Sequence, residues 1–302
     1  MKKNYENDLS FFEMQLTSHN IPTTLHHYTS LNSLIGIVDR KELWFTNIEY
    51  LNDITEFKEG KDLFLKNLSK VESEFESPET YASIKSYIKE EIIPYDFFSF
   101  SLSEEEDSLE QWRGYANNEN GVMITFQGIF GYLKSQGIEC IKVVYDEEPY
   151  EKEICSLIEK MKKWDFSNAD FDLFYFWGKF NRVLANVFLK KKNSIFKNER
   201  EWKLCYSHRE IDDIDKSDDD AIEDKIRFRL AKNYIIPYSI LNFRRLKFFD
   251  KTHFIHEVLI SPTIKEKEID GNRSLEGIKR LLTKNKVERA SEKVKFSSLP
   301  YR

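Results

Sequence analysis

The chain of 302 residues is 40% hydrophobic and 15% aromatic, with only 10 glycines and 7 prolines, which predicts a substantial folded core and excludes a loop-rich or disordered chain. Charged residues make up 32% of the chain. The net charge of -6 gives no whole-chain indication of nucleic-acid binding.

In the N-terminal half, apolar residues at helical spacing predict helices, and short alternating runs predict strands. Ser30 is expected to cap the helix that follows it, and Thr55 or Asp53 the next one. We expect helices at 6–18, 30–39, 56–69 and 78–92, strands at 24–28, 43–46 and 97–102, and a short helix beginning at 107 or 108.

In the C-terminal half, the turn signal at 117–121 precedes a predicted strand at 122–126. Further strands are expected at 139–145, 202–206, 226–230, 233–236 and 254–261, with a last one ending before 297, and helices at 150–164, 169–191 and 274–284. The acidic stretch 210–225 is expected to be a solvated loop. Because helices and strands follow in mixed order without regular βα alternation, the pattern favours an α+β fold.

Three cysteines, Cys140, Cys155 and Cys205, are widely spaced and match no zinc-type pattern, so reduced thiols are expected. The N-terminus has no apolar run of signal length, and no stretch approaches the length of a membrane span. We therefore expect a cytoplasmic protein that does not enter a membrane.

Two adjacent histidines, His26 and His27, stand at the end of the first predicted strand, where their side chains point to opposite faces, so that at most one is expected in a given cleft. A neutral imidazole can bind a ribose hydroxyl, and Tyr28 can stack on a flat ring. One exposed and one core histidine is the plainer alternative. A metal site of both histidines with Asp53 and Glu56 is another, although the spacing is not diagnostic.

Two carboxylates, Glu199 and Glu201, flank Arg200 at the start of the strand predicted to end at Tyr206. If Glu201 opens that strand, both carboxylates face the same side. One could then orient or deprotonate a nucleophile while the other stabilises a developing cation. The alternative is a solvated strand start with Arg200 paired outward.

Arg113 follows Trp112, a position suited to holding a phosphate or carboxylate in fork geometry. It could equally pair with the acidic loop 104–107. Lys190–Lys192 with Lys197 predict a modest basic patch at a helix C-terminus, and phosphate contacts would be sought there if the substrate were nucleic acid. Common nucleotide-binding, zinc-protease and serine-hydrolase motifs are absent.

Taken in order, these segments resemble a widespread bacterial family first catalogued as a domain of unknown function, whose members often accompany phage-defence and toxin systems. The resemblance spans nearly the whole chain from Leu25. The stretches that carry it are His26–Ser30, Leu43–Thr46, Leu51–Asp53 with Glu56, Phe98–Ser101, Gln111–Tyr115 with Gly121-Val122, Phe196–Lys203 and Ser298–Arg302.

That family looks like a divergent branch of the ADP-ribosyltransferases, which bind NAD in the cleft of a split β-sheet and use an early histidine, a middle aromatic or hydroxyl residue and a late glutamate. The resemblance implies one ADP-ribosyltransferase-like domain over residues 1–302, with an N-terminal helical extension at 1–22 and helical insertions at 56–93 and 150–192.

By the same resemblance, His27 would hold the nicotinamide-side ribose. Glu201 would hydrogen-bond that ribose and stabilise the oxocarbenium ion, and Glu199 would contact the acceptor. The middle position has no clear match, and Tyr50 and Tyr115 are the two candidates. The implied cofactor-binding set is His27, Tyr28, Thr29, Asn52, Arg113 and Tyr115.

The expected function is therefore NAD-dependent ADP-ribosyl transfer by a toxin-like or antiphage effector, with NAD as substrate and no metal. The acceptor could be protein, RNA or DNA, and a neutralising antitoxin or a defence-system component is the expected kind of partner. Three alternatives stay open: an NAD glycohydrolase using the same cleft, a non-catalytic nucleotide-sensing module using Arg113, and a nuclease whose metal is held by Asp53, Glu56 and Glu201.

Overall fold

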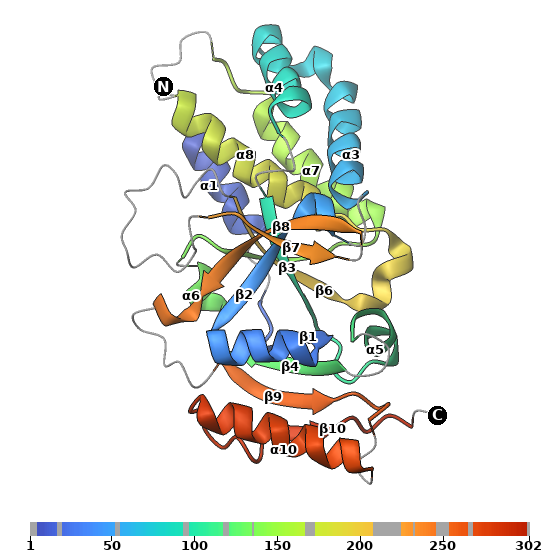
Figure 1. Ribbon diagram of the computed structural model, residues 1–302. Helices are drawn as coiled ribbons and strands as arrows, with labels where there is room; N and C mark the ends of the chain where they lie inside the picture. The colour runs from blue at the N-terminus through green and yellow to red at the C-terminus, as the bar shows by residue number, and fades with distance from the viewer. Residues whose placement is uncertain are drawn as a thin grey trace.

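A computed structural model describes residues 5–16, 20–51, 55–92, 97–116, 121–134, 136–166, 173–207, 225–231, 233–245, 254–264 and 268–300. A large mixed β-sheet crosses the middle of the molecule, and helices are grouped mainly on one side of it (Figure 1). The chain thus folds as a mixture of α and β structure, as the order of its predicted elements indicated.

The helices are α1 (Tyr5–Leu16), α2 (Leu31–Ile35), α3 (Glu56–Lys70), α4 (Pro78–Glu90), α5 (Leu109–Tyr115), α6 (Phe130–Lys134), α7 (Glu147–Met161), α8 (Leu173–Lys190) and α10 (Ile269–Lys284). The strands are β1 (Thr24–Ser30), β2 (Glu42–Asn47), β3 (Phe97–Ser103), β4 (Gly121–Gln127), β5 (Glu139–Lys142), β6 (Glu201–Ser207), β7 (Arg227–Ala231), β8 (Tyr234–Asn242), β9 (Ile255–Ile260) and β10 (Val294–Phe296). Two short helical segments matter for the site: the π-helix η1 (Gly36–Arg40) and the 3-10 helix η5 (Ser194–Glu199).

Most predicted elements lie where the sequence placed them, with a few differences in their bounds. Ser30 does cap α2, because its hydroxyl accepts from the Ser33 N–H at 3.1 Å, but the helix continues as a π-turn. The strand expected at 139–145 ends at Lys142, since Val144 pairs instead with Lys191. Helix α6 was not predicted, and most of the acidic stretch 210–225 lies outside the described residues.

The sheet is divided beside its central strand, β3. One edge of β3 pairs along its whole length with β6, which in turn pairs with β5. The other edge is shared: β1 pairs at Ser103, whereas β2 pairs at Phe98 and Ser99. From there one arm runs β1-β4-β9-β10 and the other β2-β8-β7, so that a gap in pairing opens between β1 and β2.

Alternation along β3 and β6 gives these strands one apolar and one polar face. Phe98, Phe100 and Leu102 pack into the core that includes α10 and α2, together with Trp202, Leu204 and Tyr206 of β6. The opposite face carries Ser99, Ser101 and Ser103, which lie directly across from Cys205, Lys203 and Glu201 in the antiparallel register. Because directly paired residues project to the same side, five of these six side chains form a polar row across the two strands.

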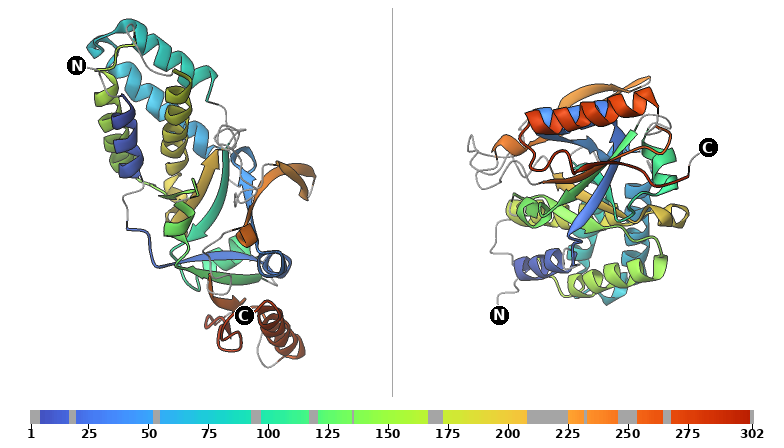
Figure 2. Two further views of the ribbon diagram at one scale, coloured as in Figure 1. Left: turned by 90° about the vertical axis from the view of Figure 1, so that its left-hand side faces the viewer. Right: turned by 90° about the horizontal axis from the view of Figure 1, so that it is seen from below.

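Helices α1, α3, α4, α7 and α8 cover the polar side and enclose a second core rich in aromatic rings (Figures 1 and 2). Helix α10 lies at the far end, beside β9 and β10 (Figure 1). The regions predicted as helical insertions therefore pack against the strands that carry the site. Among the described helices, none has the length and apolar character needed to cross a membrane.

Candidate functional site

A cavity of about 590 Å³ borders the gap in pairing between β1 and β2. This volume lies within the range usual for sites that hold cofactors and small molecules. The cavity is lined by both the serines and the apolar residues of β3, so it reaches past both faces of that strand. Both His26 and His27 consequently border it, where strand alternation alone predicted one at most.

Three carboxylates and one ammonium group of the cavity wall belong to a charged cluster, which a second ammonium group, that of Lys203, completes. Lys192 Nζ lies 2.6 Å from Glu199 Oε2, 2.7 Å from Glu201 Oε2 and 3.1 Å from Glu56 Oε1. Lys203 Nζ binds the other oxygen of Glu56 and also donates to the Leu189 carbonyl at 3.3 Å. Glu56, Glu201 and both lysines are buried.

The cluster is assembled from four separate segments. Glu56 opens α3 and Lys192 follows the end of α8, so two of the helices that cover the polar face each contribute one charge. Glu199 ends η5. Glu201 and Lys203 come from β6. Each charged group would be costly to bury alone, and the mutual pairing offsets that cost.

Glu199 and Glu201 converge, as the sequence predicted, but not by strand alternation. Glu201 does open β6, whereas Glu199 is the last residue of η5. Between them Arg200 adopts a left-handed backbone conformation with φ 42°, which turns the chain so that both carboxylates meet Lys192. The Arg200 guanidinium points away and pairs with Glu105 at 3.0 Å.

The electrostatics of the cluster favour an ionised Glu201. Burial opposes ionisation, but Lys203 and Lys192 outweigh it and hold the pKa of Glu201 below its usual value. Burial likewise opposes the charge on Lys192, yet Glu201, Glu56 and Glu199 raise its pKa well above the ordinary range. Burial raises the pKa of Glu56, although Lys203 and Lys192 oppose that shift.

Hydroxyl groups complete the environment of the two late carboxylates. Tyr115 donates its phenolic proton to Glu199 Oε1 at 2.5 Å, and burial raises the pKa of Tyr115. The backbone N–H of Glu201 donates to the Tyr145 hydroxyl at 2.8 Å. Ser101 hydrogen-bonds the Glu201 side chain. These contacts hold both carboxylates in place beside the cavity.

His27 is held in one tautomer at the gap in the sheet. Its Nδ1 lies 3.0 Å from the Ser101 carbonyl, which can only accept, so Nδ1 carries the proton. Burial lowers the pKa of His27 to about 4, and the ring packs on Phe100 with centroids 4.3 Å apart. A neutral imidazole with a protonated Nδ1 leaves Nε2 as an acceptor for a ligand hydroxyl.

His26 has a different partner. Its Nδ1 lies 3.0 Å from Thr125 Oγ1, and burial lowers its pKa to about 4 as well. It lies opposite Ser103, which pairs with Glu201 on the next strand. The plain alternative of one exposed and one core histidine is therefore wrong, since His26 is buried and His27 is half-buried.

Other predicted site residues are distributed unevenly. Tyr28 and Thr29 border the cavity, but the Tyr28 hydroxyl donates to the Glu105 carbonyl at 2.7 Å and accepts from the Ser108 N–H at 2.9 Å. Its ring packs edge-on against Trp112 at 5.0 Å. Tyr28 thus anchors the start of α5 through its hydroxyl.

Of the two candidates for the middle position, Tyr115 lies in the carboxylate cluster, while Tyr50 borders the cavity beside Tyr234, with ring centroids 6.3 Å apart. Asn52 lies outside the described residues. Arg113 is exposed on α5 and is not among the residues that line the cavity.

The basic patch predicted at Lys190–Lys192 is wrong, because all three side chains are buried. Lys190 pairs with Glu153 at 2.6 Å, and Lys191 donates to the Tyr145 carbonyl at 2.9 Å. Lys192 is instead the centre of the carboxylate cluster. The one local feature that accompanies this role is the position of Lys192 shortly after the end of the largely apolar helix α8.

Among the described residues, no group of three or more histidine, cysteine, aspartate or glutamate side chains has an arrangement that could hold a metal ion. The three carboxylates of the cluster surround an ammonium group instead. Asp53, one of the predicted ligands, lies outside the described part of the chain. The three cysteines are free thiols, in agreement with the prediction from their spacing.

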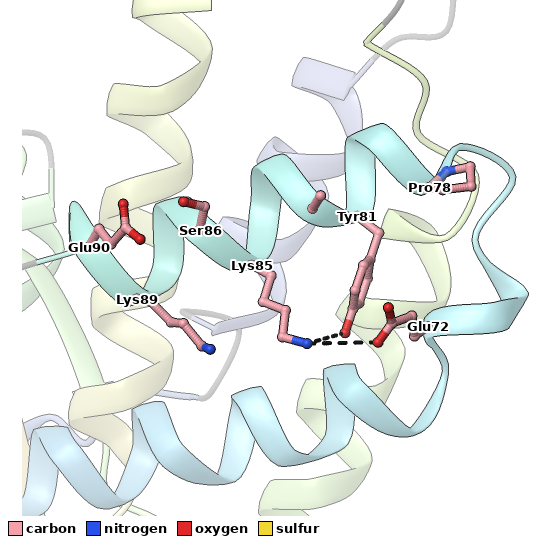
Figure 3. A pocket seen from close by; sticks show the side chains of 8 residues that line it. Glu72, Pro78, Tyr81, Lys85, Ser86, Lys89 and Glu90 are labelled. Atoms are coloured by element: carbon pink, nitrogen blue, oxygen red, sulfur yellow. Dashed lines mark hydrogen bonds and ion pairs between the residues drawn. The ribbon is translucent and has the colours of Figure 1, made fainter.

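A second hollow of about 390 Å³ lies between α4 and the segment that precedes it (Figure 3). Lys85 extends there toward the Tyr81 hydroxyl at 2.9 Å and Glu72 at 3.7 Å. The hollow is open to solvent and draws its lining from α4 and Glu72 alone, whereas the first cavity gathers groups from many segments, so the chemistry of the protein is better sought there.

Comparison with known proteins adds one match. A family model described as a protein of unknown function, DUF2971, matches residues 111–204. The matched region includes Tyr115, Lys192, Glu199 and Glu201, but neither the histidines of β1 nor Glu56. No curated protein and no solved structure matches the chain. The sequence resemblance to a family of unknown function is thus supported over this region.

Proposed function

We propose that the cavity binds NAD and that the protein transfers its ADP-ribose group to an acceptor. The observation that carries the proposal is that His27, from the start of the chain, and Glu201, two-thirds of the way along it, border one cavity of about 590 Å³. The divided sheet beside them is consistent with the split sheet that the family resemblance implies.

The chemistry fits the charges of the site. When the bond between nicotinamide and the anomeric carbon breaks, its electron pair leaves with a neutral nicotinamide, and positive charge develops on the ribose. An ionised Glu201 would stabilise that oxocarbenium ion and accept a hydrogen bond from a ribose hydroxyl. His27 Nε2 would accept a second one, which fixes the sugar between the two groups.

Glu199 lies beside Glu201 on the same ammonium group and would take the proton of the acceptor as it attacks the anomeric carbon. Lys192, which pairs with both Glu199 and Glu201, helps to keep the buried Glu201 ionised. With three carboxylates and two ammonium groups, the cluster has a formal charge of -1 when all are ionised, and this suits a cationic transition state.

The test is incubation of the purified protein with labelled NAD and cell lysate, followed by protease or nuclease digestion of the labelled fraction. Glu201→Gln is expected to lower transfer at least about a hundredfold, the usual effect of removing a group that stabilises transition-state charge. Because Glu201 is buried rather than at a wet strand edge, some loss of stability is expected too. NAD binding by the folded variant must therefore be measured alongside turnover.

Glu153→Gln is the matched control. Glu153 also pairs with a buried lysine, Lys190, at 2.6 Å, but it does not line the cavity. Equal transfer by wild type and Glu201→Gln would refute the assignment. Label recovered as free ADP-ribose would indicate hydrolysis, and tight NAD binding without turnover would indicate a nucleotide sensor.

The family resemblance adds the role of a toxin-like or antiphage effector, acting in the cytoplasm on a protein, RNA or DNA acceptor. Which digestion releases the label identifies the acceptor class. Co-expression with neighbouring genes would show whether a neutralising partner exists.

A further inference from the structure

The wall of the cavity also carries a guanidinium that forms no ion pair with a carboxylate among the described residues. Arg229 of β7 lines the cavity, and its Nη2 donates to Thr46 Oγ1 at 2.9 Å. Its Nε is buried and has no hydrogen-bond partner. Burial lowers the pKa of Arg229, and the nearby Tyr238 and Tyr234 oppose this shift.

A guanidinium without an acidic partner is unusual beside a cavity. Arginine side chains that are removed from water are normally paired with a carboxylate or a phosphate, because an unsatisfied charged donor is costly to bury. Each of the cluster lysines follows that rule, whereas Arg229 does not. The missing partner is therefore expected to be a ligand.

A second guanidinium stands close by. Arg40, at the end of η1, also lines the cavity and lies over the Trp44 ring at 5.9 Å. Trp44 and Thr46 project from the same face of β2, about 7 Å apart along the strand. The two arginines thus meet the cavity above neighbouring positions of one strand. The carboxylate on that face, Glu42, accepts from the Trp44 indole at 3.0 Å.

We infer that Arg229, with Arg40 beside it, forms an anion subsite that binds the diphosphate of a dinucleotide. Planar guanidinium groups bind phosphate oxygens in pairs, which suits this role better than a lysine would. Naming the ligand as NAD depends on the proposed function. The anion subsite itself depends only on the two arginines and the cavity.

The cavity would then have two functional ends. The carboxylate cluster would take the ribose that becomes cationic, and the arginine end would take the phosphates. The β7–β8 hairpin that supplies Arg229 projects from the sheet (Figure 2), with Leu230 83% and Tyr234 55% exposed at the cavity wall.

The experiment is titration calorimetry with inorganic pyrophosphate and with ADP at low salt. Arg229→Gln is expected to weaken both affinities about tenfold or more, since hydrogen bonds to charged groups are among the strongest that proteins make. Arg229→Lys keeps the charge but loses the fork, and an intermediate affinity is expected. Arg227→Gln is the matched control, because Arg227 is exposed on the same strand and does not line the cavity.

Thermal unfolding of the ligand-free protein distinguishes a binding role of Arg229 from a structural one. Removal of Arg229 leaves no carboxylate unpaired, so the thermal midpoint of the free Arg229→Gln variant should equal or exceed that of wild type. A lower midpoint with unchanged pyrophosphate affinity would overturn the inference. Equal weakening by Arg227→Gln would do so too, because general electrostatic attraction would then explain the binding.

Arg113→Gln provides a further comparison, since the sequence made Arg113 a candidate for holding a phosphate or carboxylate. If the affinity falls with Arg113 and not with Arg229, or if wild type binds no pyrophosphate at millimolar concentration, the subsite is refuted. The outcome is independent of turnover: pyrophosphate binding through Arg229 in a protein that transfers nothing would refute the transferase proposal alone.

Discussion

Lys192→Met is the most informative perturbation of the cluster. The ammonium group of Lys192 contacts three carboxylates within 3.1 Å, and its side chain is only 6% exposed. Removing one partner of a buried ion pair typically destabilises a protein by about 3–5 kcal/mol. The upper part of that range is expected here, because Glu199 and Glu201 lose the cation they share while Lys203 stays with Glu56.

The loss of stability caused by Lys192→Met should depend on pH, and the structure determines whether it grows or shrinks as the pH rises. Without Lys192, burial and repulsion from the neighbouring carboxylates would raise the native pKa of Glu201 above that of the unfolded chain. The native variant would then bind more protons than the unfolded one, so its stability would fall as the pH rises from about 4.5 through the raised pKa. The deficit relative to wild type should accordingly be smaller at pH 5 than at pH 8.

Urea unfolding of both proteins at pH 5, 6, 7 and 8 measures this. Lys197→Met serves as the control. It removes the same charge from an ion pair with Asp146, whose atoms are 2.8 Å apart, but the side chains of Lys197 and Asp146 are both about 60% exposed. Exposed pairs contribute about 0–1 kcal/mol. If Lys192→Met loses no more stability than Lys197→Met, or if its deficit is the same at every pH, the ionised cluster described here is wrong.

Three further predictions concern packing, histidine burial and the tyrosine of the site. Gly60→Ala should destabilise the protein by about 1–3 kcal/mol, because a Cβ at this position would lie 2.4 Å from a backbone oxygen of α8. Gly277→Ala, at an exposed helix position with free space around it, should instead stabilise the protein by about 1 kcal/mol. Thermal unfolding compares the two variants, and equal effects would contradict the close approach of α3 to α8. Burial lowers the native pKa of His26 to about 4, below its unfolded value, so the free energy of unfolding of wild type should fall by up to about 3 kcal/mol between pH 6.5 and pH 4. In urea unfolding, the difference in stability between wild type and His26→Gln should therefore narrow as the pH falls over this range. A constant difference would argue against a buried neutral ring. Tyr115→Phe removes the donor 2.5 Å from Glu199 and should cost about 1.5–3 kcal/mol in denaturant unfolding, and no measurable loss would show that this hydrogen bond adds no net stability.

Much of the local structure follows from neighbouring residues. The alternation of Phe98-Ser99-Phe100-Ser101 predicts a strand with one polar face because side chains alternate along extended backbone. Ser30 predicts a helix start because its hydroxyl satisfies an N–H of the first turn. Elements missed or misplaced, such as α6 and the end of β5, have bounds that depend on distant partners.

The pairing of Glu199 with Glu201 shows how a correct prediction can have a different cause. The sequence supplied two carboxylates close in the chain, and they do meet. The left-handed turn at Arg200 and the ammonium of Lys192 bring them together, and neither has a local signature.

The sequence by itself determined which segments form helices and strands, and which polar groups lie among aromatic residues, because these properties depend on spacing over a few residues. The tertiary structure alone decided which charges are buried together. The sequence indicates that Lys192 belongs to a surface patch, whereas in the structure carboxylates from α3 and β6 contact it. The sequence likewise does not distinguish Arg229 from other arginines, whereas the β7–β8 hairpin places it at the cavity. The reason is that burial and ion pairing are set by residues far apart in the chain, whose approach follows from the division of the sheet and the packing of helices across it.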